Sequence, residues 1–427
     1  MKLKNLIKKI VPAKIFSWYH FTLALLAALY YRFPAKNITV IGITGTKGKT
    51  TTSELINSIL EQAGFKTALA STLRFKIGDQ SERNMLKMTM PGRFFLQQFL
   101  TKATSANCDY AIIEMTSEGA RFYRHKFIYL DSLVFTGITP EHIESHGSYE
   151  KYRQAKLAIV KALANSPKPN KILVVNKDSQ DAEHFLKIKT DKKIVFGEET
   201  GKPYTVSENG IEFSFANEVI KSKLTGSFNL YNLLAAASLT KALGINAKTI
   251  KQAIENFNGI LGRMEIIHSN ASEVRGKQKF LVIVDYAHTP ESLEKVYKTY
   301  PTRKKICVLG GTGGGRDHWK REVMGSIVDN YCDEIILTDE DPYDEDPMAI
   351  VDDIATGIKT KEFTTIMDRR QAINQAIASA SKTEGSVVLI TGKGTDPYIM
   401  GPEGSKLPWD DATVAKEELE LVLKNNA

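Results

Sequence analysis

Residues 37–51 decide the fold, and they read Asn37-Ile-Thr-Val-Ile-Gly-Ile-Thr-Gly-Thr-Lys-Gly-Lys-Thr-Thr51. The first seven residues are mostly β-branched or apolar, which indicates a short buried strand. Apolar residues follow at helical spacing from Leu55 to Leu60, and Gly64 ends that predicted helix. A strand, a glycine-rich turn with Gly-Lys-Thr and a helix together predict a phosphate-binding loop. The strict pattern has glycine where this chain has Ile43, so the loop is a variant.

The chemistry of this loop suits a nucleoside triphosphate. Glycines allow backbone N–H groups to converge on phosphate oxygens, and the start of the helix adds partial positive charge. Lys49 is placed to reach the β- and γ-phosphates, and the Thr50 hydroxyl to bind Mg²⁺. A glycine turn with an incidental lysine would not explain the flanking strand and helix. The predicted ATP-binding residues of the loop are Gly45, Thr46, Lys47, Gly48, Lys49, Thr50 and Thr51.

A second group of polar residues follows two further predicted strands. The run from Asp109 to Glu114 is a buried-strand pattern that ends in a carboxylate, and Glu141-His142 comes after the strand 133–136. Parallel sheets bind ligands at the carboxyl ends of their strands, so Glu114 and His142 are candidate magnesium ligands beside the phosphates. His142 and His146 are also spaced as in a zinc site, but no third ligand is evident.

The 427 residues carry 57 Lys+Arg and 49 Asp+Glu, which gives a formal charge of 57 − 49 = +8. The length predicts two or three domains, and the average composition excludes a collagen-like, disordered or polytopic membrane chain. No acid precedes Glu54, and removing the first 36 residues leaves 50 − 49 = +1. The basic charge is therefore local, which argues against nucleic-acid binding. The residues that carry it are Lys2, Lys4, Lys8, Lys9, Lys14, Arg32 and Lys36.

Residues 15–31 contain no formal charge and many aromatic side chains. Seventeen residues is the lower limit for a spanning helix, and aromatics behind lysines suit a membrane interface. We favour a helix on the membrane surface, with a helix docked on the protein or a true span as alternatives. Cys108, Cys307 and Cys332 form no metal or redox motif, and their odd, scattered placement is typical of structural cysteines in a reducing cytoplasm.

Alternating strand and helix patterns from 38 to 176 predict an α/β fold with a doubly wound sheet. A hairpin is expected around Glu208-Asn209-Gly210, a helix over 229–243 and a hinge over 257–262. Apolar strands at 281–284, 305–309, 334–338 and 386–390 predict a second, Rossmann-like α/β domain. Gly310 to Gly315 follows one of these strands and is a further candidate phosphate site. The predicted organisation is an N-terminal hydrophobic helix (1–36), a central P-loop domain (37–260) and a C-terminal domain (261–427).

With these residues in view, the chain from about 37 to 409 resembles the Mur ligase family. The motifs that carry the resemblance occur in the family's order. They are Gly42–Thr51, Glu114-Met-Thr-Ser117, Glu141-His142 with His146-Gly147, Gln154-Ala155-Lys156, Leu224–Asn232, Gly262-Arg263-Met-Glu265, Asp285-Tyr-Ala-His288-Thr-Pro290, Gly310–Asp317 and Gly392-Lys-Gly394.

The resemblance implies roles for individual positions. Lys49, His142 and Lys156 match catalytic residues, and Thr50, Glu114, His142 and Lys156 match Mg²⁺ ligands, with Lys156 carbamylated. A surface lysine on a helix is the alternative for Lys156. Further ATP contacts are implied for Asn229, Asn232, Arg263, Asp285 and His288. Substrate contacts are implied for Thr89, Met90, Ser117, Arg124, Arg316, Asp341, Tyr343, Gly392 and Asp396.

The run Glu340-Asp341-Pro342-Tyr343 departs from the Asp-Asn-Pro-Arg run of the family's diaminopimelate-adding enzymes. The missing arginine and the surrounding acids favour lysine as the added amino acid, because a cation suits an acidic field. A solvated acidic loop is the alternative. Only 36 residues precede Asn37, where the family's synthetases have a domain that holds UDP, so UDP is held differently or the donor is lipid-linked.

The function implied is an ATP-dependent amide ligase of peptidoglycan synthesis. It would add an amino acid to a muramyl-peptide carboxylate, such as that of UDP-MurNAc-L-Ala-D-Glu, through an acyl phosphate. Alternatives are a relative acting on a lipid-linked muramyl peptide or on another polyglutamate-like carboxylate, and a membrane-docked ATP-binding scaffold without ligase activity. We expect a cytoplasmic monomer, peripheral at the inner face of the cytoplasmic membrane, with ATP and Mg²⁺ as cofactors.

Overall fold

The computed structural model describes residues 13–140, 146–269, 276–315 and 317–425. The chain divides into two compact units. Unit 1 comprises Met1–Thr205, Glu212–Ser222 and Phe228–Phe257, and unit 2 comprises Val206–Ile211, Lys223–Ser227 and Asn258–Ala427. The predicted residues His142 and Arg316 lie outside the described residues.

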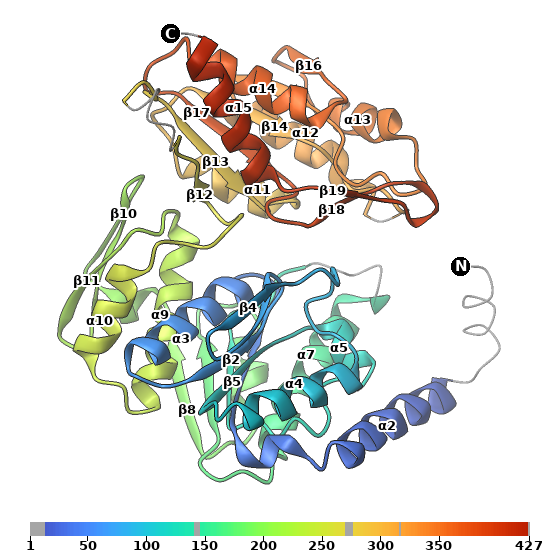
Figure 1. Ribbon diagram of the computed structural model, residues 1–427, viewed down its shortest axis with the longest axis vertical. Coiled ribbons are helices and arrows are strands. Elements are labelled where there is room, and N and C mark those ends of the chain that lie inside the picture. Colours follow the sequence, from blue (N-terminus) through green and yellow to red (C-terminus); the bar gives the residue numbers. More distant parts are fainter. Residues whose placement is uncertain (1–12, 141–145, 270–275, 316, 426–427) are drawn as a thin grey trace. The chain divides into compact units, whose positions relative to one another are not determined.

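Unit 1 is built on an eight-stranded sheet of order β4-β3-β2-β5-β1-β6-β7-β8 (Figure 1). The strands are β1 (Thr39–Thr44), β2 (Thr67–Ala70), β3 (Arg74–Ile77), β4 (Gln80–Arg83), β5 (Tyr110–Met115), β6 (Ser132–Phe135), β7 (Ile172–Asn176) and β8 (Lys192–Phe196). Six strands are parallel, but β3 and β4 pair antiparallel, so the sheet is mixed rather than fully parallel.

Helices cover both faces of this sheet. They are α3 (Lys49–Gln62), α4 (Arg93–Ser105), α5 (Ser117–Arg121), α7 (Tyr149–Ala164) and α8 (Ala182–Leu186). The chain reverses direction across the sheet after β2, and right-handed crossovers therefore place α3 opposite α4 and α7. The apolar core on the α4 and α7 face includes Val40, Ile113, Leu133, Leu96 and Val160.

Further elements of the chain lie before and after the strands of this large sheet. The first is α2 (Ala13–Tyr30), which is followed by the 3₁₀ turn η1 (Pro34–Asn37). The turn η2 (Glu198–Gly201), the strands β9 (Tyr204–Ser207), β10 (Gly210–Phe215) and β11 (Glu218–Ser222), and helices α9 (Ser227–Ala242) and α10 (Ala247–Asn256) come after the large sheet. No helix within the described residues is both long and apolar enough to cross a membrane.

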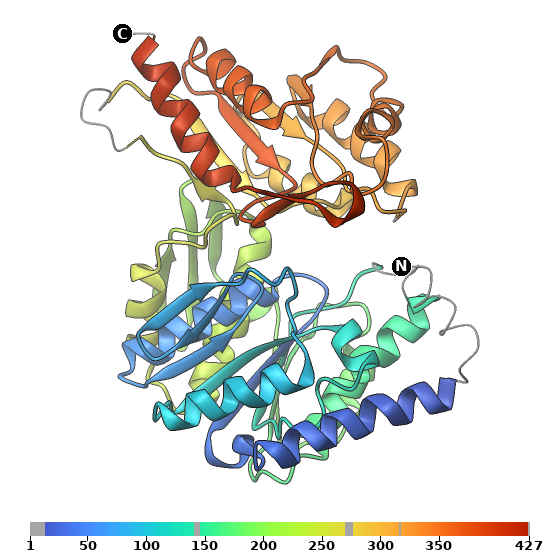
Figure 2. The same ribbon diagram turned by 45° about the vertical axis from the view of Figure 1, so that its right-hand side comes forward.

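Unit 2 has a six-stranded sheet of order β12-β13-β17-β14-β15-β16. Its strands are β12 (Glu265–Ile266), β13 (Leu281–Asp285), β14 (Lys305–Leu309), β15 (Glu334–Leu337), β16 (Phe363–Thr365) and β17 (Val387–Thr391), with the pair β18 (Tyr398–Met400) and β19 (Lys406–Pro408) beside the turn η4 (Pro402–Gly404). The helices are α11 (Pro290–Lys298), α12 (Trp319–Tyr331), α13 (Pro347–Ala355), α14 (Arg369–Ala380) and α15 (Asp411–Asn425). The last two cover one face of the sheet, as Figure 2 shows.

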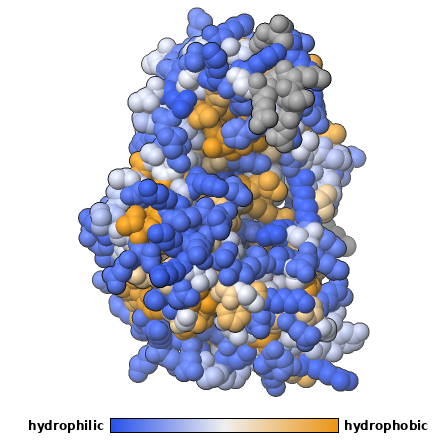
Figure 3. Space-filling view, turned by 60° about the vertical axis from the view of Figure 1, so that its left-hand side comes forward, coloured by the Kyte–Doolittle hydropathy of each residue, from blue (hydrophilic) through white to orange (hydrophobic). Residues whose placement is uncertain are grey.

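The cysteines differ from the sequence expectation. Cys307 on β14 and Cys332 at the end of α12 form a disulfide, and Cys108 is free and buried. Their separation of 25 residues forms no recognisable motif, and only the parallel pairing of β14 with β15 brings the two segments together. Hydrophilic side chains dominate the face drawn in Figure 3, with apolar patches between them.

Candidate functional site in the phosphate loop and the adjoining strands

The loop between β1 and α3 is shaped by its glycines. Gly48 caps α3 with a φ of 80°, a backbone conformation that side chains disfavour. A Cβ at Gly48 would lie 2.2 Å from Oδ1 of Asn232, and one at Gly45 would lie 1.9 Å from Oγ1 of Thr136. The loop is therefore packed so closely that only glycine fits at these two positions.

Two lysines converge on this loop. Nζ of Lys49 donates to the carbonyls of Gly45 (3.0 Å) and Thr46 (2.9 Å), and Nζ of Lys156 donates to the same Gly45 carbonyl (2.7 Å). Lys156 comes from α7, is 2% exposed and lies 4.9 Å from the ring centre of Tyr152. The alternative that Lys156 is a surface lysine is therefore wrong.

Glu114 is the penultimate residue of β5 and lies beside this loop, in register with Ile43 of β1. Its Oε2 accepts hydrogen bonds from the hydroxyls of Thr50 (3.2 Å) and Thr72 (2.8 Å). Its Oε1 accepts from the backbone N–H of Thr72 (3.1 Å) and the hydroxyl of Ser53 (3.3 Å). Burial raises the pKa of Glu114, although Lys49 and the bonds from Thr72 and Thr50 oppose that shift. A cation near Glu114 would offset the cost of its burial.

The candidate substrate residues of unit 1 lie at the same edge of the sheet. The Thr89 hydroxyl contacts that of Thr72 (2.9 Å), which connects it to the Glu114 carboxylate. Arg124 donates through Nη1 to the carbonyl of Met90, and Ser117 contacts Nε2 of His146 (3.1 Å).

The two asparagines predicted to contact ATP lie on α9. Nδ2 of Asn232 donates to Oδ1 of Asn229 (2.8 Å), and both side chains are buried. Because Asn232 lies against Gly48, this pair adjoins the start of α3.

In unit 2, the predicted ATP residues Arg263, Asp285 and His288 form one cluster. The Arg263 guanidinium lies 4.2 Å from the ring centre of Tyr286, whose carbonyl accepts from Nδ1 of His288 (2.7 Å). Asp285 accepts two backbone N–H bonds, from Met264 and Ala287, both 2.7 Å. Burial raises the pKa of Asp285, and the charge of Arg263 lowers it.

The predicted amino-acid site of unit 2 is dense with charge. Lys393 is almost fully buried, and its Nζ donates to Oδ1 of Asp341 (2.8 Å) and Oδ2 of Asp396 (3.3 Å). Glu340 accepts from the Thr312 hydroxyl (2.9 Å), while its buried Oε2 has no hydrogen-bond partner among the described residues. The solvated-loop alternative is thus wrong for Glu340 and Asp341, which are 3% and 5% exposed.

The glycines around this site permit close packing. A Cβ at Gly392 would lie 2.2 Å from Oε2 of Glu340, and one at Gly313 would lie 2.1 Å from the carbonyl of Pro342. Tyr343 has a φ of 54° and its N–H donates to the carbonyl of Met400 (2.9 Å). Packing against the run 340–343 therefore accounts for these glycines without a second phosphate site.

Comparison with known proteins identifies the family of this chain. Residues 43–240 match the family described as Mur ligase middle domain, and residues 262–394 match Mur ligase, glutamate ligase domain. A UDP-N-acetylmuramoyl-L-alanyl-D-glutamate–2,6-diaminopimelate ligase of Bacillus cereus is 35% identical over 95% of this chain and 82% of its own length. The chain belongs to the Mur ligase family.

Two further similarities agree with this assignment. A UDP-N-acetylmuramyl-tripeptide synthetase of Roseiflexus is 34% identical over 93% of this chain and 81% of its own length. A solved structure of a UDP-N-acetylmuramoyl-L-alanyl-D-glutamate–2,6-diaminopimelate ligase superimposes with a TM-score of 0.62 at 26% identity, covering 90% of this chain and 78% of the other. This Mur ligase is therefore an ATP-dependent enzyme that forms amide bonds.

Mur ligases use ATP and Mg²⁺, and the residues of this Mur ligase fit that requirement. Thr50 and Glu114 present oxygen atoms 3.2 Å apart at the start of α3, and oxygen ligands are those that Mg²⁺ prefers. Glu114 is fully buried, and a bound cation would stabilise its ionised form. Within the described residues, no group of three or more His, Cys, Asp or Glu side chains forms a metal site, so a zinc site finds no support there.

Sequence reasoning missed several residues of this site. Thr72 connects Glu114 with Thr89, and Tyr152 contacts the Thr46 hydroxyl (2.8 Å). Thr72 lies just beyond β2, a neighbour of β5, and no motif marks it in the sequence. Tyr152 precedes Lys156 by one helical turn, and that spacing could have indicated a shared face.

Proposed function

We propose that this Mur ligase adds an amino acid to the carboxylate of a muramyl peptide, UDP-MurNAc-L-Ala-D-Glu or a similar donor, in peptidoglycan synthesis. The observation that carries the proposal is the convergence of Lys49, Thr50, Glu114 and Lys156 on one phosphate loop. The names of the similar enzymes from Bacillus cereus and Roseiflexus support the choice of donor.

The reaction needs an activated carboxylate, since a carboxylate is a poor electrophile at neutral pH. A carboxylate oxygen of the donor attacks the γ-phosphorus of ATP, ADP leaves, and an acyl phosphate forms. The neutral amine of the amino acid then attacks the carbonyl carbon, and phosphate leaves as the amide forms. Lys49 and the loop N–H groups stabilise the negative charge of the transferred phosphoryl group. Thr50 and Glu114 would hold the magnesium ion, which would supply further positive charge.

Lys156 is proposed to act as a carbamate, formed when its neutral amine adds to CO₂. The Lys156 side chain is 2% exposed and contacts the phosphate loop at the Gly45 carbonyl. A carbamate on this side chain would present two anionic oxygens at the loop, and these would support a magnesium ion held by Thr50 and Glu114. His142 is a further proposed ligand.

For the added amino acid, we propose lysine in preference to diaminopimelate. Asp341 is paired with Lys393, so Glu340, with its unbonded Oε2, is the carboxylate that supports the preference. Burial raises the pKa of Glu340, and a cationic side chain nearby would favour its ionised form. Tyr343 stands where diaminopimelate-adding enzymes have arginine.

The remaining assignments are also proposals. Arg124, Thr89, Met90 and Ser117 are assigned to the donor, and Asn229, Asn232, Arg263, Asp285 and His288 to ATP. Gly392, Asp396 and Arg316 are assigned to the amino acid. The enzyme is proposed to act as a monomer in the cytoplasm, where ATP is available, with the inner membrane surface as its neighbour.

The test is phosphate release with UDP-MurNAc-L-Ala-D-Glu, ATP and Mg²⁺, with lysine or diaminopimelate as the acceptor. Faster turnover with diaminopimelate would overturn the lysine preference. No turnover with any muramyl peptide, including a lipid-linked one, would overturn the function itself and leave an ATP-binding scaffold.

A substitution of Lys156 tests the carbamate. Lys156→Ala should lower ligation by orders of magnitude while ATP binding persists, and added bicarbonate should not restore it. Lys161→Ala, an exposed lysine on the same helix, is the matched control. Unchanged phosphate release by Lys156→Ala would exclude the proposed role.

A further inference from the structure

Helix α2 is apolar on both of its faces, although one face is exposed. Its inner face is formed by His20, Ala24, Ala27 and Ala28, which are buried. Its outer face consists of Ile15, Trp18, Tyr19, Leu26, Leu29 and Tyr30, with exposed fractions of 49–74%. Spacings of three, four and seven residues place these six side chains on one stripe, which also contains the half-buried Thr22. A helix on a protein surface normally presents charged residues there, and this stripe has no charged side chain.

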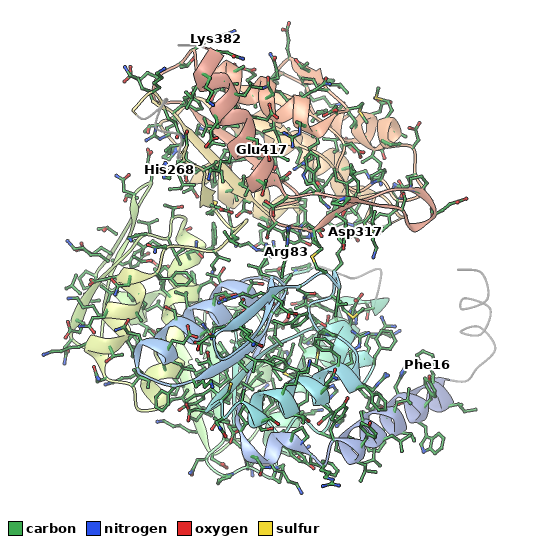
Figure 4. The ribbon with its side chains drawn as sticks, viewed as in Figure 1. Phe16, Arg83, His268, Asp317, Lys382 and Glu417 are labelled. Atoms are coloured by element: carbon green, nitrogen blue, oxygen red, sulfur yellow. A yellow bond between two sulfur atoms is a disulfide. The ribbon has the colours of Figure 1, made fainter. Side chains whose placement is uncertain are left out.

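The inner face fixes α2 against unit 1. Phe16, which Figure 4 labels near the start of the helix, packs edge-on against Phe122 with ring centres 6.3 Å apart. His20 packs on Phe122 at 5.1 Å and bonds through Nδ1 to the Arg93 guanidinium at the start of α4. Burial and the charges of Arg93 and Arg124 lower the pKa of His20 to about 4, so neutral His20 accepts this bond. These contacts hold the helix on the protein and direct the outer face away from it.

Positive charge flanks the outer face in the sequence. Five lysines precede it, Arg32 and Lys36 follow it, and no acid occurs before Glu54. Arg32 and Lys36 are both exposed. Anionic lipid attracts such clusters, and Trp and Tyr side chains are favoured at the level of the lipid headgroups. A second copy of the same face would instead bring two clusters of like charge together.

We propose that the outer face of α2 docks this Mur ligase on an anionic lipid bilayer. The helix lies in the plane of the interface, with the six apolar side chains among the acyl chains and the exposed Arg32 and Lys36 at the headgroups. It does not cross the bilayer, because its inner face is committed to Phe122 and Arg93. Docking concerns where the enzyme works, and it does not rest on the donor or amino acid assigned above.

Docking would also bring the donor loop to the membrane. Arg93 contacts His20 and directly follows the run Thr89–Gly92, whose Met90 carbonyl accepts from Arg124. The residues proposed to hold the donor are therefore connected to α2 through Arg93 and through Phe122 and Tyr123, which precede Arg124.

The first experiment uses the full chain and Trp18, which is 70% exposed. Vesicles of phosphatidylcholine with phosphatidylglycerol, carrying brominated acyl chains, should quench Trp18 fluorescence, and salt should weaken the binding. Trp18→Phe should abolish the quenching, while Trp319→Phe, which removes a 60% exposed tryptophan of unit 2, should leave it. Quenching that persists in Trp18→Phe would overturn the proposal.

The second experiment measures vesicle binding by flotation. Leu26→Ser and Leu29→Ser should each weaken binding about tenfold, since each removes the burial of one leucine side chain. Leu407→Ser, at a leucine of unit 2 with 56% exposure, is the matched control and should bind as the wild type does. Equal binding by all variants, or a dimer in sedimentation that Leu29→Ser dissociates, would overturn docking. Phosphate release measured in parallel distinguishes a failure of docking from a failure of the proposed ligase function. Turnover without vesicle binding refutes docking and leaves the ligase function standing.

Discussion

The substitution Glu114→Gln should separate the folding role of this residue from its role in magnesium binding. Oε2 of Glu114 faces two hydroxyls, those of Thr50 and Thr72, while Oε1 faces the N–H of Thr72 and the hydroxyl of Ser53. A glutamine can place its NH₂ on the first side, because hydroxyls also accept hydrogen bonds, and its oxygen on the second. No buried donor is stranded, so the loss of stability from hydrogen bonding should be at most about 1 kcal/mol.

The negative charge of Glu114, in contrast to its hydrogen bonds, lowers the stability of the folded protein. The pKa of Glu114 is raised in the folded protein, so the folded state holds this proton more tightly than the unfolded state does. The contribution of Glu114 to stability is therefore greatest below the unfolded pKa and falls as the pH rises through the folded pKa. At pH 8, without metal, Glu114→Gln should be as stable as the wild type or more stable.

Urea denaturation with and without Mg²⁺ and ATP tests both statements. Ligand at 100 times its Kd stabilises the wild type by about 2.7 kcal/mol, and a 100-fold weaker variant at the same concentration gains only about 0.4 kcal/mol. Glu82→Gln, at an exposed position of β4, is the matched control. The reasoning fails if Glu114→Gln keeps the full stabilisation by Mg²⁺ and ATP, or if its metal-free form loses more than about 3 kcal/mol.

Three further predictions follow from other sites. Gly48→Ala should weaken ATP binding at least about tenfold in calorimetry, because φ is 80° and the new Cβ would lie 2.2 Å from Oδ1 of Asn232. The control Gly64→Ala has a φ of 89° but open space around its Cβ, so it should cost about 1 kcal/mol of stability and leave ATP affinity unchanged. Arg369→Met should lower the free energy of unfolding by about 3–5 kcal/mol in urea denaturation, since it leaves the buried Asp411 carboxylate, 2.7 Å away, without its ion-pair partner. Arg370→Met, at a 45% exposed side chain, should cost less than about 1 kcal/mol. Burial lowers the pKa of His125 from 6.5 to about 3, so its contribution to stability is present above pH 6.5 and is lost as the pH falls. In thermal unfolding, His125→Leu should reduce the slope of the unfolding free energy against pH, between pH 6.5 and 4, by about 1.4 kcal/mol per pH unit. An unchanged slope would contradict this.

The sequence predicted the parts of the fold whose signals are local. Apolar runs and glycines located β1, the loop and α3, as well as the parallel strands of unit 2. The antiparallel β3 and β4 were not foreseen, because strand direction in a sheet depends on pairing with distant segments. The disulfide of Cys307 was missed for the same reason.

The candidate site shows the same division between local signals, which the sequence reveals, and contacts between distant segments, which it does not. The sequence identified the residue types that bind phosphate and magnesium, but it could not show which charges neutralise one another. Asp341 appeared to be a free acid in an acidic run, yet it is buried against Lys393. Thr72, which connects Glu114 to Thr89, has no motif and was found only through the neighbouring positions of β2 and β5.

The carbonyl of Gly45 has a consequence for how the enzyme responds to dissolved CO₂. It accepts hydrogen bonds from both Lys49 and Lys156, so the two Nζ atoms lie beside the same oxygen. A carbamate on Lys156 would remove one of these bonds and place negative charge near Lys49 before ATP arrives. Carbamate formation and ATP binding are then thermodynamically linked, and by reciprocity each changes the equilibrium constant of the other by the same factor. An ATP affinity that depends on bicarbonate concentration would be the measurable sign of that linkage.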